Sequence, residues 1–217
     1  MYNGSSSPDL INCTFEANTT GFTNSGCIGA GMYNDSSSPT LTNCKFLNNV
    51  SYYGGGGMFN DLSSPVIVNT TFIENTTRRG GGGLYNRYNS SPSLTNCIFL
   101  DNWTTELPGG AVFNDSSSPI FMNCTIANNS AAGGDGGGFN NEDGSSPVLT
   151  NCILWGNTPL SFYDSFSVPV VTYSLVEGGY TGTGNIDADP LFADSSNGDL
   201  RLHFVSVAVD TGTSSGA

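Results

Sequence analysis

Positive charge is scarce in this sequence. Its 217 residues include five Lys and Arg against 18 Asp and Glu, which gives a formal net charge of −13. Proteins that bind nucleic acid or anionic lipid headgroups use a basic surface to contact phosphates. The composition therefore predicts that neither nucleic acid nor an anionic membrane surface is a partner.

Long apolar runs and helical patterns are also missing. No apolar run approaches the roughly 20 residues of a membrane-spanning helix, so we expect no membrane insertion by this chain. No segment combines apolar residues at a 3.6-residue spacing with capping residues, and no signal peptide is visible. Gly, Ser, Asn and Thr are abundant instead, while 13 Phe and 9 Tyr argue against disorder.

Familiar catalytic motifs are absent as well. The sequence has neither G-x-S-x-G nor H-E-x-x-H. Its one histidine, His203, lies between apolar residues, as a strand residue would. Asp135, Glu142 and Asp143 are close together, but they lie in Gly-rich segments without the second converging acid that a glycosidase needs. We therefore assign no catalytic residue.

A repeat of about 27 residues dominates what is present. Gly54 to Asn75 is one copy: a Gly-rich entry, an aromatic-Asn pair, Ser-Ser-Pro, a short apolar stretch closed by Asn, and Phe-x-x-Asn. Self-similarity at this period indicates a solenoid. The Ser-Pro prolines of the six copies are Pro8, Pro39, Pro65, Pro92, Pro119 and Pro147.

The pattern within one copy predicts short strands. Leu41, Cys44 and Phe46 are apolar and their neighbours polar, so the sequence alternates on either side of Asn43. Asn43 shifts this phase by one, as a left-handed residue at a sharp corner would. The glycines at 54–57 predict another corner. Stacked turns would then form inward columns of Phe, Cys and Leu, and ladders of Asn amides.

These features predict an all-β fold, a right-handed parallel β-helix with about 26–28 residues per coil. We expect six coils in residues 1–157, and degenerate coils and a C-terminal end segment of the same solenoid in residues 158–217. Residues 171–176 align with 149–154 as a seventh coil, and residues 21–27 form a loop. A leucine-rich repeat has a similar period, but its L-x-x-L-x-L signature is missing. The chain opens within a repeat and ends without a closing element, which predicts a fragment of a longer protein.

Five of the six cysteines share one position of the repeat. A buried stack of reduced thiols is the favoured interpretation, because Thr70 fills the same position in the third copy. Disulfides and metal ligation stay open as alternatives. Cys27 lies outside the column without an evident partner. The five in the column are Cys13, Cys44, Cys97, Cys124 and Cys152.

A second repeated position carries acids. Asp35 and Asp61 occupy it in neighbouring copies, where their oxygens are weak candidate ligands for Ca²⁺. Arg87 separates this pair from Asp115, and in the sixth copy we align Asn141 with this position. The alternative is that Asp simply suits a turn. We expect no other cofactor.

The repeat resembles a known family. Phe46 to Asn49 and its equivalents, together with Gly-Gly-Gly-Met58 and Gly-Gly-Gly-Leu84, are similar to the paired GGAI and FxxN motifs of chlamydial polymorphic outer membrane proteins. Residues 185–194 resemble a segment that ends many secreted bacterial β-helix repeat proteins. The resemblance implies a secreted or surface-displayed passenger-like domain, although Gly137-Gly138-Phe139 departs from GGAI.

The leading hypothesis is a non-catalytic secreted or cell-surface β-helix that acts as an adhesin, passenger or structural stalk. Its partners would be glycans or host cell-surface proteins. The alternative is a carbohydrate-active enzyme of the pectate-lyase-like β-helix type. Uncovered terminal coils could also support end-to-end self-association. The candidates for an exposed aromatic sugar platform are Tyr52, Tyr53, Trp103, Trp155 and Tyr163. Arg78 and Arg79 are interpreted as a solvated turn.

Overall fold

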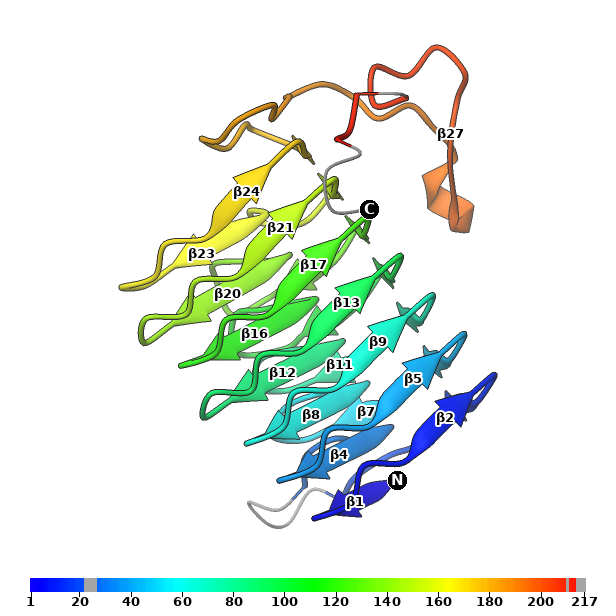
Figure 1. Cartoon of the computed structure of the whole chain (residues 1–217), viewed down its shortest axis with the longest axis vertical. Helices are drawn as coiled ribbons and strands as arrows, with labels where there is room; N and C mark the ends of the chain where they lie inside the picture. The colour runs from blue at the N-terminus through cyan, green and yellow to red at the C-terminus, as the bar shows by residue number, and fades with distance from the viewer. Residues whose placement is uncertain (22–26, 210, 214–217) are drawn as a thin grey trace.

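Four parallel sheets wrap around a single core (Figure 1). The computed structural model describes residues 1–21, 27–209 and 211–213. Most of the loop predicted at residues 21–27 therefore lies outside the described residues. Within the described chain, the one helical element is the 3-10 helix η1 (Ser195–Asn197), and no helix is long and apolar enough to cross a membrane.

Sheets A, B and C each take one strand from all seven coils and sheet D takes one from four of them, so the strands of each sheet appear in chain order. Sheet A contains β1 (Tyr2–Gly4), β4 (Met32–Asp35), β8 (Met58–Asp61), β12 (Leu84–Arg87), β16 (Val112–Asp115), β20 (Phe139–Glu142) and β23 (Phe162–Asp164). Sheet B contains β2 (Asp9–Ile11), β5 (Thr40–Thr42), β9 (Val66–Val68), β13 (Ser93–Thr95), β17 (Ile120–Met122), β21 (Val148–Thr150) and β24 (Val170–Thr172).

The other two sheets complete the coil. Sheet C contains β3 (Thr14–Glu16), β6 (Lys45–Leu47), β10 (Thr71–Ile73), β14 (Ile98–Leu100), β18 (Thr125–Ala127), β22 (Ile153–Trp155) and β25 (Leu175–Val176). Sheet D contains β7 (Val50–Ser51), β11 (Thr76–Thr77), β15 (Trp103–Thr104) and β19 (Ser130–Ala131). All pairs within these sheets are parallel, which confirms the predicted β-solenoid.

The corner between sheets B and C is made by the predicted asparagine. Asn43 has a φ of 54° and Asn69 a φ of 50°, both in the left-handed region that Asn tolerates. Tyr173 takes this place in the seventh coil with a φ of 49°. Pairing of Leu149 with Val171 confirms the predicted alignment of that coil.

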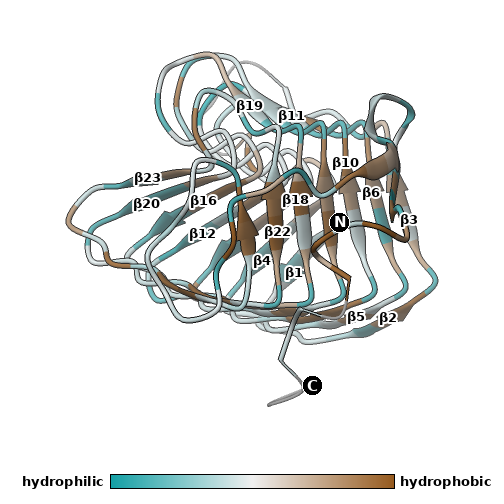
Figure 2. Cartoon of the chain, turned by 90° about the horizontal axis from the view of Figure 1, so that it is seen from above, coloured by the Kyte–Doolittle hydropathy of each residue, from teal (hydrophilic) through white to brown (hydrophobic). Residues whose placement is uncertain are grey.

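The inward columns are also confirmed. Phe46, Phe72 and Phe99 stack along the axis with ring centroids 4.8 and 4.6 Å apart, and all three are fully buried. In sheet B the buried residue of the third copy is Ile67, while Val66 points outward and is 46% exposed. Figure 2 shows the hydrophobic residues gathered on the strands around the interior and mostly hydrophilic connecting loops.

Two ladders of asparagine side chains run through the interior. One lies in sheet A, where the amide of Asn34 donates to Asn60 at 2.8 Å and that of Asn60 to Asn86 at 2.9 Å. The other follows sheet C, where Asn75 donates to Asn102 at 2.9 Å. These buried amides are satisfied by the equivalent residues of neighbouring coils, as the repeat predicted.

The predicted register was wrong by one residue in the sixth copy. Asn141, rather than Asn140, pairs with Asn114 and continues the sheet A ladder. Glu142 therefore follows Asp115 at the outward acidic position that Asn141 was expected to occupy. The alignment failed because Phe139 fills the inward position that Val112 holds, so the aromatic-Asn pair of this copy is shifted.

The C-terminal segment takes two different paths. Its first part covers the end of the solenoid: Tyr180 packs on Phe162 at 4.7 Å, and Ile186 bridges to Leu175. Its second part differs from the expected final coil. β26 (Phe192–Asp194) and β27 (Asp199–Leu202) pair antiparallel with each other and join none of the four sheets.

Candidate functional site

An aromatic stripe crosses the outer face of sheet A. In β8, Met58 and Asn60 point inward, so Phe59 and Asp61 point outward. Phe59 and Tyr85 stack at 4.7 Å, Tyr85 and Phe113 also at 4.7 Å, and Tyr33 meets Phe59 edge-on at 5.7 Å. We call Tyr33, Phe59, Tyr85 and Phe113 the aromatic stripe. Parallel register converts one aromatic position of the repeat into this continuous column.

Arginines cover part of the stripe and of the adjoining loops. Arg87 lies over the ring of Phe59 at 4.9 Å, and Arg79 lies over Tyr53 at 5.0 Å. Arg78 lies over Tyr52 at 4.9 Å and forms an ion pair with Glu106. Two of the five basic residues of the chain, Arg79 and Arg87, thus line the same groove, and Arg78 directly precedes Arg79 in the chain. Sequence analysis missed this cluster because its members meet only after the coils stack.

A groove of about 330 Å³ remains between the stripe and the loops, and we call it the aromatic groove. Both charged residues that line it are arginines, and no acidic side chain does so. Arg87 is paired with Asp61 at 2.6 Å, whereas Arg79 has no carboxylate partner among the described residues. The lining residues are Ile28, Tyr53, Phe59, Arg79, Tyr85, Arg87, Leu107 and Phe113.

The phenols beside the groove are held in their neutral form. Burial raises the pKa of Tyr85, and nearby Asp115 raises it further. Burial is also the main cause of the raised pKa of Tyr33, followed by the negative charge of Asp61. Among the described residues, the lining of the groove therefore contains two guanidinium groups, aromatic rings and the neutral hydroxyl of Tyr85, and no carboxylate or imidazole.

The candidate Ca²⁺ ligands are neighbours on the outer face of sheet A. Asp35 pairs in register with Asp61, and Asp61 with Arg87. Arg87 donates two hydrogen bonds to Oδ2 of Asp61, at 3.1 and 2.6 Å, while Asp35 accepts one from Tyr2 at 3.2 Å. Described residues include no group of three or more His, Cys, Asp or Glu that could hold a metal ion. The two acids are brought together as expected, but a guanidinium already occupies one of them.

The residues of the cysteine column pack in the core and take part in hydrogen bonds with the backbone. All six cysteines are free, and Cys44, Cys97, Cys124 and Cys152 are buried while Cys13 and Cys27 are half-buried. Sγ of Cys124 accepts the backbone N–H of Cys97 at 3.4 Å, and Oγ1 of Thr70 accepts that of Cys44 at 3.2 Å. Contact with Cys124 and burial raise the pKa of Cys97 well above its ordinary value, so this thiol stays protonated.

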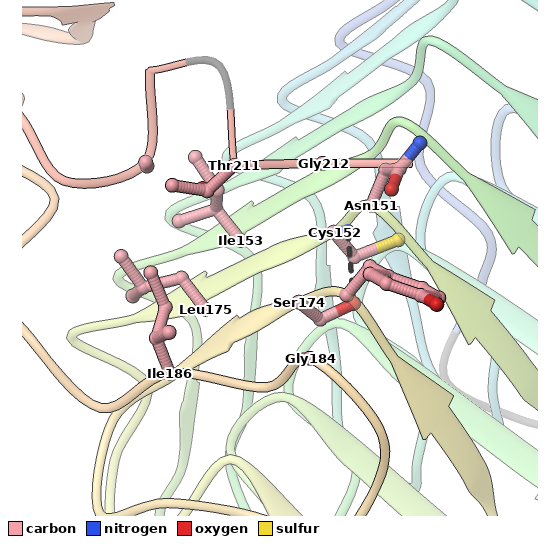
Figure 3. Close-up of a pocket in the computed structure, with 11 residues that line it drawn as sticks. Asn151, Cys152, Ile153, Ser174, Leu175, Gly184, Ile186, Thr211 and Gly212 are labelled. Carbon is pink, nitrogen blue, oxygen red and sulfur yellow. Dashed lines mark hydrogen bonds between the residues drawn. The ribbon is translucent and has the colours of Figure 1, made fainter. Parts of the chain in front are cut away.

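A smaller pocket of about 100 Å³ lies where the C-terminal residues return to the solenoid (Figure 3). Cys152 and Ser174 are among its lining residues, and the backbone N–H of Cys152 donates to Oγ of Ser174 at 3.0 Å. Asn151 holds the backbone of Thr213 through two hydrogen bonds of 2.8 Å. Among the described residues that line this pocket there is no acid or histidine.

The remaining candidate residues do not converge. His203 follows β27 rather than lying in a strand, is exposed, and stacks on Phe204 at 4.5 Å. Glu142 accepts a hydrogen bond from Asn140 at 2.9 Å, and Asp143 occupies a left-handed turn with a φ of 52°. Trp103 is 44% exposed on sheet D and is not among the described residues that line the groove.

Comparison with known families gives one match. The family described as "Right handed beta helix region" matches residues 1–181. No curated protein and no solved structure matches the chain. The match agrees with the four parallel sheets and confirms the predicted right-handed winding.

Proposed function

The chain belongs to the right-handed β-helix family, and from this premise we propose that it is a non-catalytic, secreted or cell-surface β-helix that acts as an adhesin or passenger domain. The observation that carries this proposal is the aromatic groove on an otherwise regular rod. Aromatic rings and the Arg79 guanidinium, which pairs with no carboxylate in the described part of the chain, form a preshaped binding surface, and the stacked coils hold it rigidly. Its partners would be glycans or cell-surface proteins.

The repeat motifs support placement outside the cell. The Gly-Gly pairs form the corner before sheet A, and Phe-x-x-Asn supplies the Phe stack and the Asn ladder of sheet C. Both motifs are similar to those of chlamydial polymorphic outer membrane proteins. The low content of Lys and Arg leaves a neutral to acidic surface of Ser, Thr and Asn that is compatible with an extracellular rod.

A glycan array and a cell-binding assay test this proposal. Purified chain is expected to bind a defined set of glycans or a host-cell surface, and the Phe113→Ala variant is expected to bind less, because this substitution removes one wall of the groove. Ile120→Ala is the matched control, since Ile120 is 48% exposed on sheet B. Absence of binding to every glycan and cell surface would overturn the adhesin assignment and leave a structural stalk.

The competing function is a carbohydrate-active enzyme of the pectate-lyase-like type. Incubation of the chain with plant and microbial polysaccharides, followed by assays of reducing ends and of unsaturated products, distinguishes the two. We expect no turnover, because the groove is lined by no acid. Sustained product formation that is lost with a groove variant would overturn the non-catalytic assignment.

A further inference from the structure

We propose that the aromatic groove binds a single carboxylate carried on an apolar body. This inference rests on the proposed binding function and names the chemistry of its ligand. Within the described chain, Arg78, Arg87 and Arg201 each pair with a carboxylate, and Arg79 in the groove does not. An unpaired guanidinium beside apolar walls is suited to a carboxylate, which can accept two of its N–H groups.

The geometry of the rings selects the same chemistry. Phe59 and Phe113 cover both faces of Tyr85 at 4.7 Å, so a ligand at this point meets the edge of the ring. Ring edges carry the positive part of the aromatic quadrupole and favour oxygen atoms, whereas sugar C–H groups stack on ring faces. A bound carboxylate would thus find favourable partners both in Arg79 and in the ring edges.

The body of the ligand is inferred from the rest of the lining. Ile28, Leu107 and the rings contribute apolar surface, and the groove volume of about 330 Å³ lies near the lower end of the range for small-molecule sites, about 300–1,000 Å³. The net charge of −13 repels a polymer that carries many negative charges. A lone carboxylate is repelled far less, because charges beyond about 8 Å are screened at physiological salt.

Two sources could present this group: a small aromatic or aliphatic acid, or the C-terminal carboxylate of a peptide that ends in an apolar residue. Isothermal titration calorimetry with phenylacetate and with the neutral phenylacetamide tests the shared chemistry. Phenylacetate is expected to bind about 10-fold or more tightly than the amide, as a charge-assisted hydrogen bond provides. The peptide Ala-Ala-Phe, with a free or an amidated C-terminus, forms the second arm.

The Arg79→Gln variant is expected to bind acid and amide equally, either phenylacetate and phenylacetamide or the free and the amidated peptide, whichever pair the wild type distinguishes. Arg79 is exposed and pairs with no carboxylate of the described residues, so its replacement should leave the fold intact, which circular dichroism checks. Arg201→Gln is the control, because it changes the net charge equally at a distant ion pair. Equal binding of acid and amide, binding of neither, or a preference that survives in Arg79→Gln would overturn the inference.

The two proposals fail separately. If glycans or cells bind the wild type and Arg79→Gln equally and acid and amide do not differ, the carboxylate inference fails and the adhesin assignment stands. If phenylacetate or the free peptide binds through Arg79 and no glycan or cell surface does, the adhesin assignment fails and the ligand chemistry stands.

Discussion

The position after each corner residue between sheets B and C accepts Cys, Thr or Ser for one physical reason. At the residue scale, its side chain must fit a small buried space and accept the backbone N–H of the preceding coil. Thr70 does so for Cys44 at 3.2 Å, Cys124 for Cys97 at 3.4 Å, and Ser174 for Cys152 at 3.0 Å. A thiol sulfur and a hydroxyl oxygen can therefore replace each other at this position, and no redox or metal chemistry is needed to explain the cysteine column.

Substitutions at Thr70 test this explanation. Thr70→Val keeps the shape but leaves the buried N–H of Cys44 unpaired, so we expect a loss of roughly 1–3 kcal/mol in the free energy of unfolding. Thr70→Cys restores an acceptor and should stay within about 1 kcal/mol of the wild type. Urea denaturation followed by circular dichroism measures both. Equal stability of the Val and Cys variants would show that the hydrogen bond contributes nothing.

The buried thiols also predict a dependence on pH. Burial raises the pKa of Cys124, and contact with Cys124 and burial raise that of Cys97, from an ordinary value of 9.0. Between about pH 9 and pH 10 the unfolded chain loses thiol protons that the folded chain retains, so stability falls as pH rises. The slope approaches about 1.4 kcal/mol per pH unit for each thiol.

Denaturation at several pH values between 8 and roughly 10 checks this dependence, within a window that lies below the ordinary pKa of 10.0 for tyrosine. The double variant Cys97→Thr, Cys124→Thr should fold, since Thr70 shows that Thr fits this position, and its stability should fall less steeply. An unchanged slope in the double variant would locate the effect in other groups.

At the scale of elements, the ladders connect one coil to the next. The amide of Asn102 donates to the carbonyl of Phe72 at 2.8 Å and to Asn129 at 2.9 Å, while its oxygen accepts from Asn75 at 2.9 Å. Each buried amide in the ladder is thus hydrogen-bonded to both neighbouring coils, so the removal of one side chain weakens hydrogen bonds in three coils.

Asn102→Ala should therefore destabilise the chain strongly. The substitution removes the side-chain donor to Oδ1 of Asn129 and to the carbonyl of Phe72, and it removes the acceptor of the Asn75 amide. We expect the free energy of unfolding to fall by about 2–5 kcal/mol. Asn18→Ala is the matched control, because Asn18 is the exposed end of the same ladder and, among the described residues, its side chain donates to Asn49 alone. Thermal unfolding compares the two, and similar melting temperatures would contradict a cooperative ladder.

The elements also show how far sequence reasoning extends. Alternation about Asn43 predicted the strands and the left-handed corner because both depend on local sterics and a repeated apolar pattern. The slip at Asn140 and the separate hairpin of β26 and β27 were missed where the repeat weakens and tertiary packing decides. The aromatic groove was missed because Arg79 and Phe113 belong to different coils and meet only in the stack.

At the scale of the whole molecule, the two ends of the described chain differ. The C-terminal end is covered by residues 178–186, where the backbone N–H of Ile186 donates to Ser174 at 2.9 Å. In the first coil, β1, β2 and β3 have a strand neighbour on one side only. Leu10 is half-buried there, whereas its equivalent Leu41 is fully buried. An open edge of strands above exposed core residues favours association with a similar edge.

A polypeptide of these 217 residues alone has one end covered by residues 178–186 and one end open at the first coil, so its association through the first coil should produce a closed two-fold dimer rather than a fibre. Sedimentation equilibrium over a concentration series measures this association, and we expect a monomer–dimer equilibrium without larger species. Leu10→Lys places a charge at the open end of the core and should abolish the dimer. Ile11→Lys is its control, since Ile11 is 63% exposed and points outward from the same strand. Growth into longer assemblies, or equal effects of the two lysines, would contradict pairing through the first coil and indicate that the sides of the solenoid associate instead.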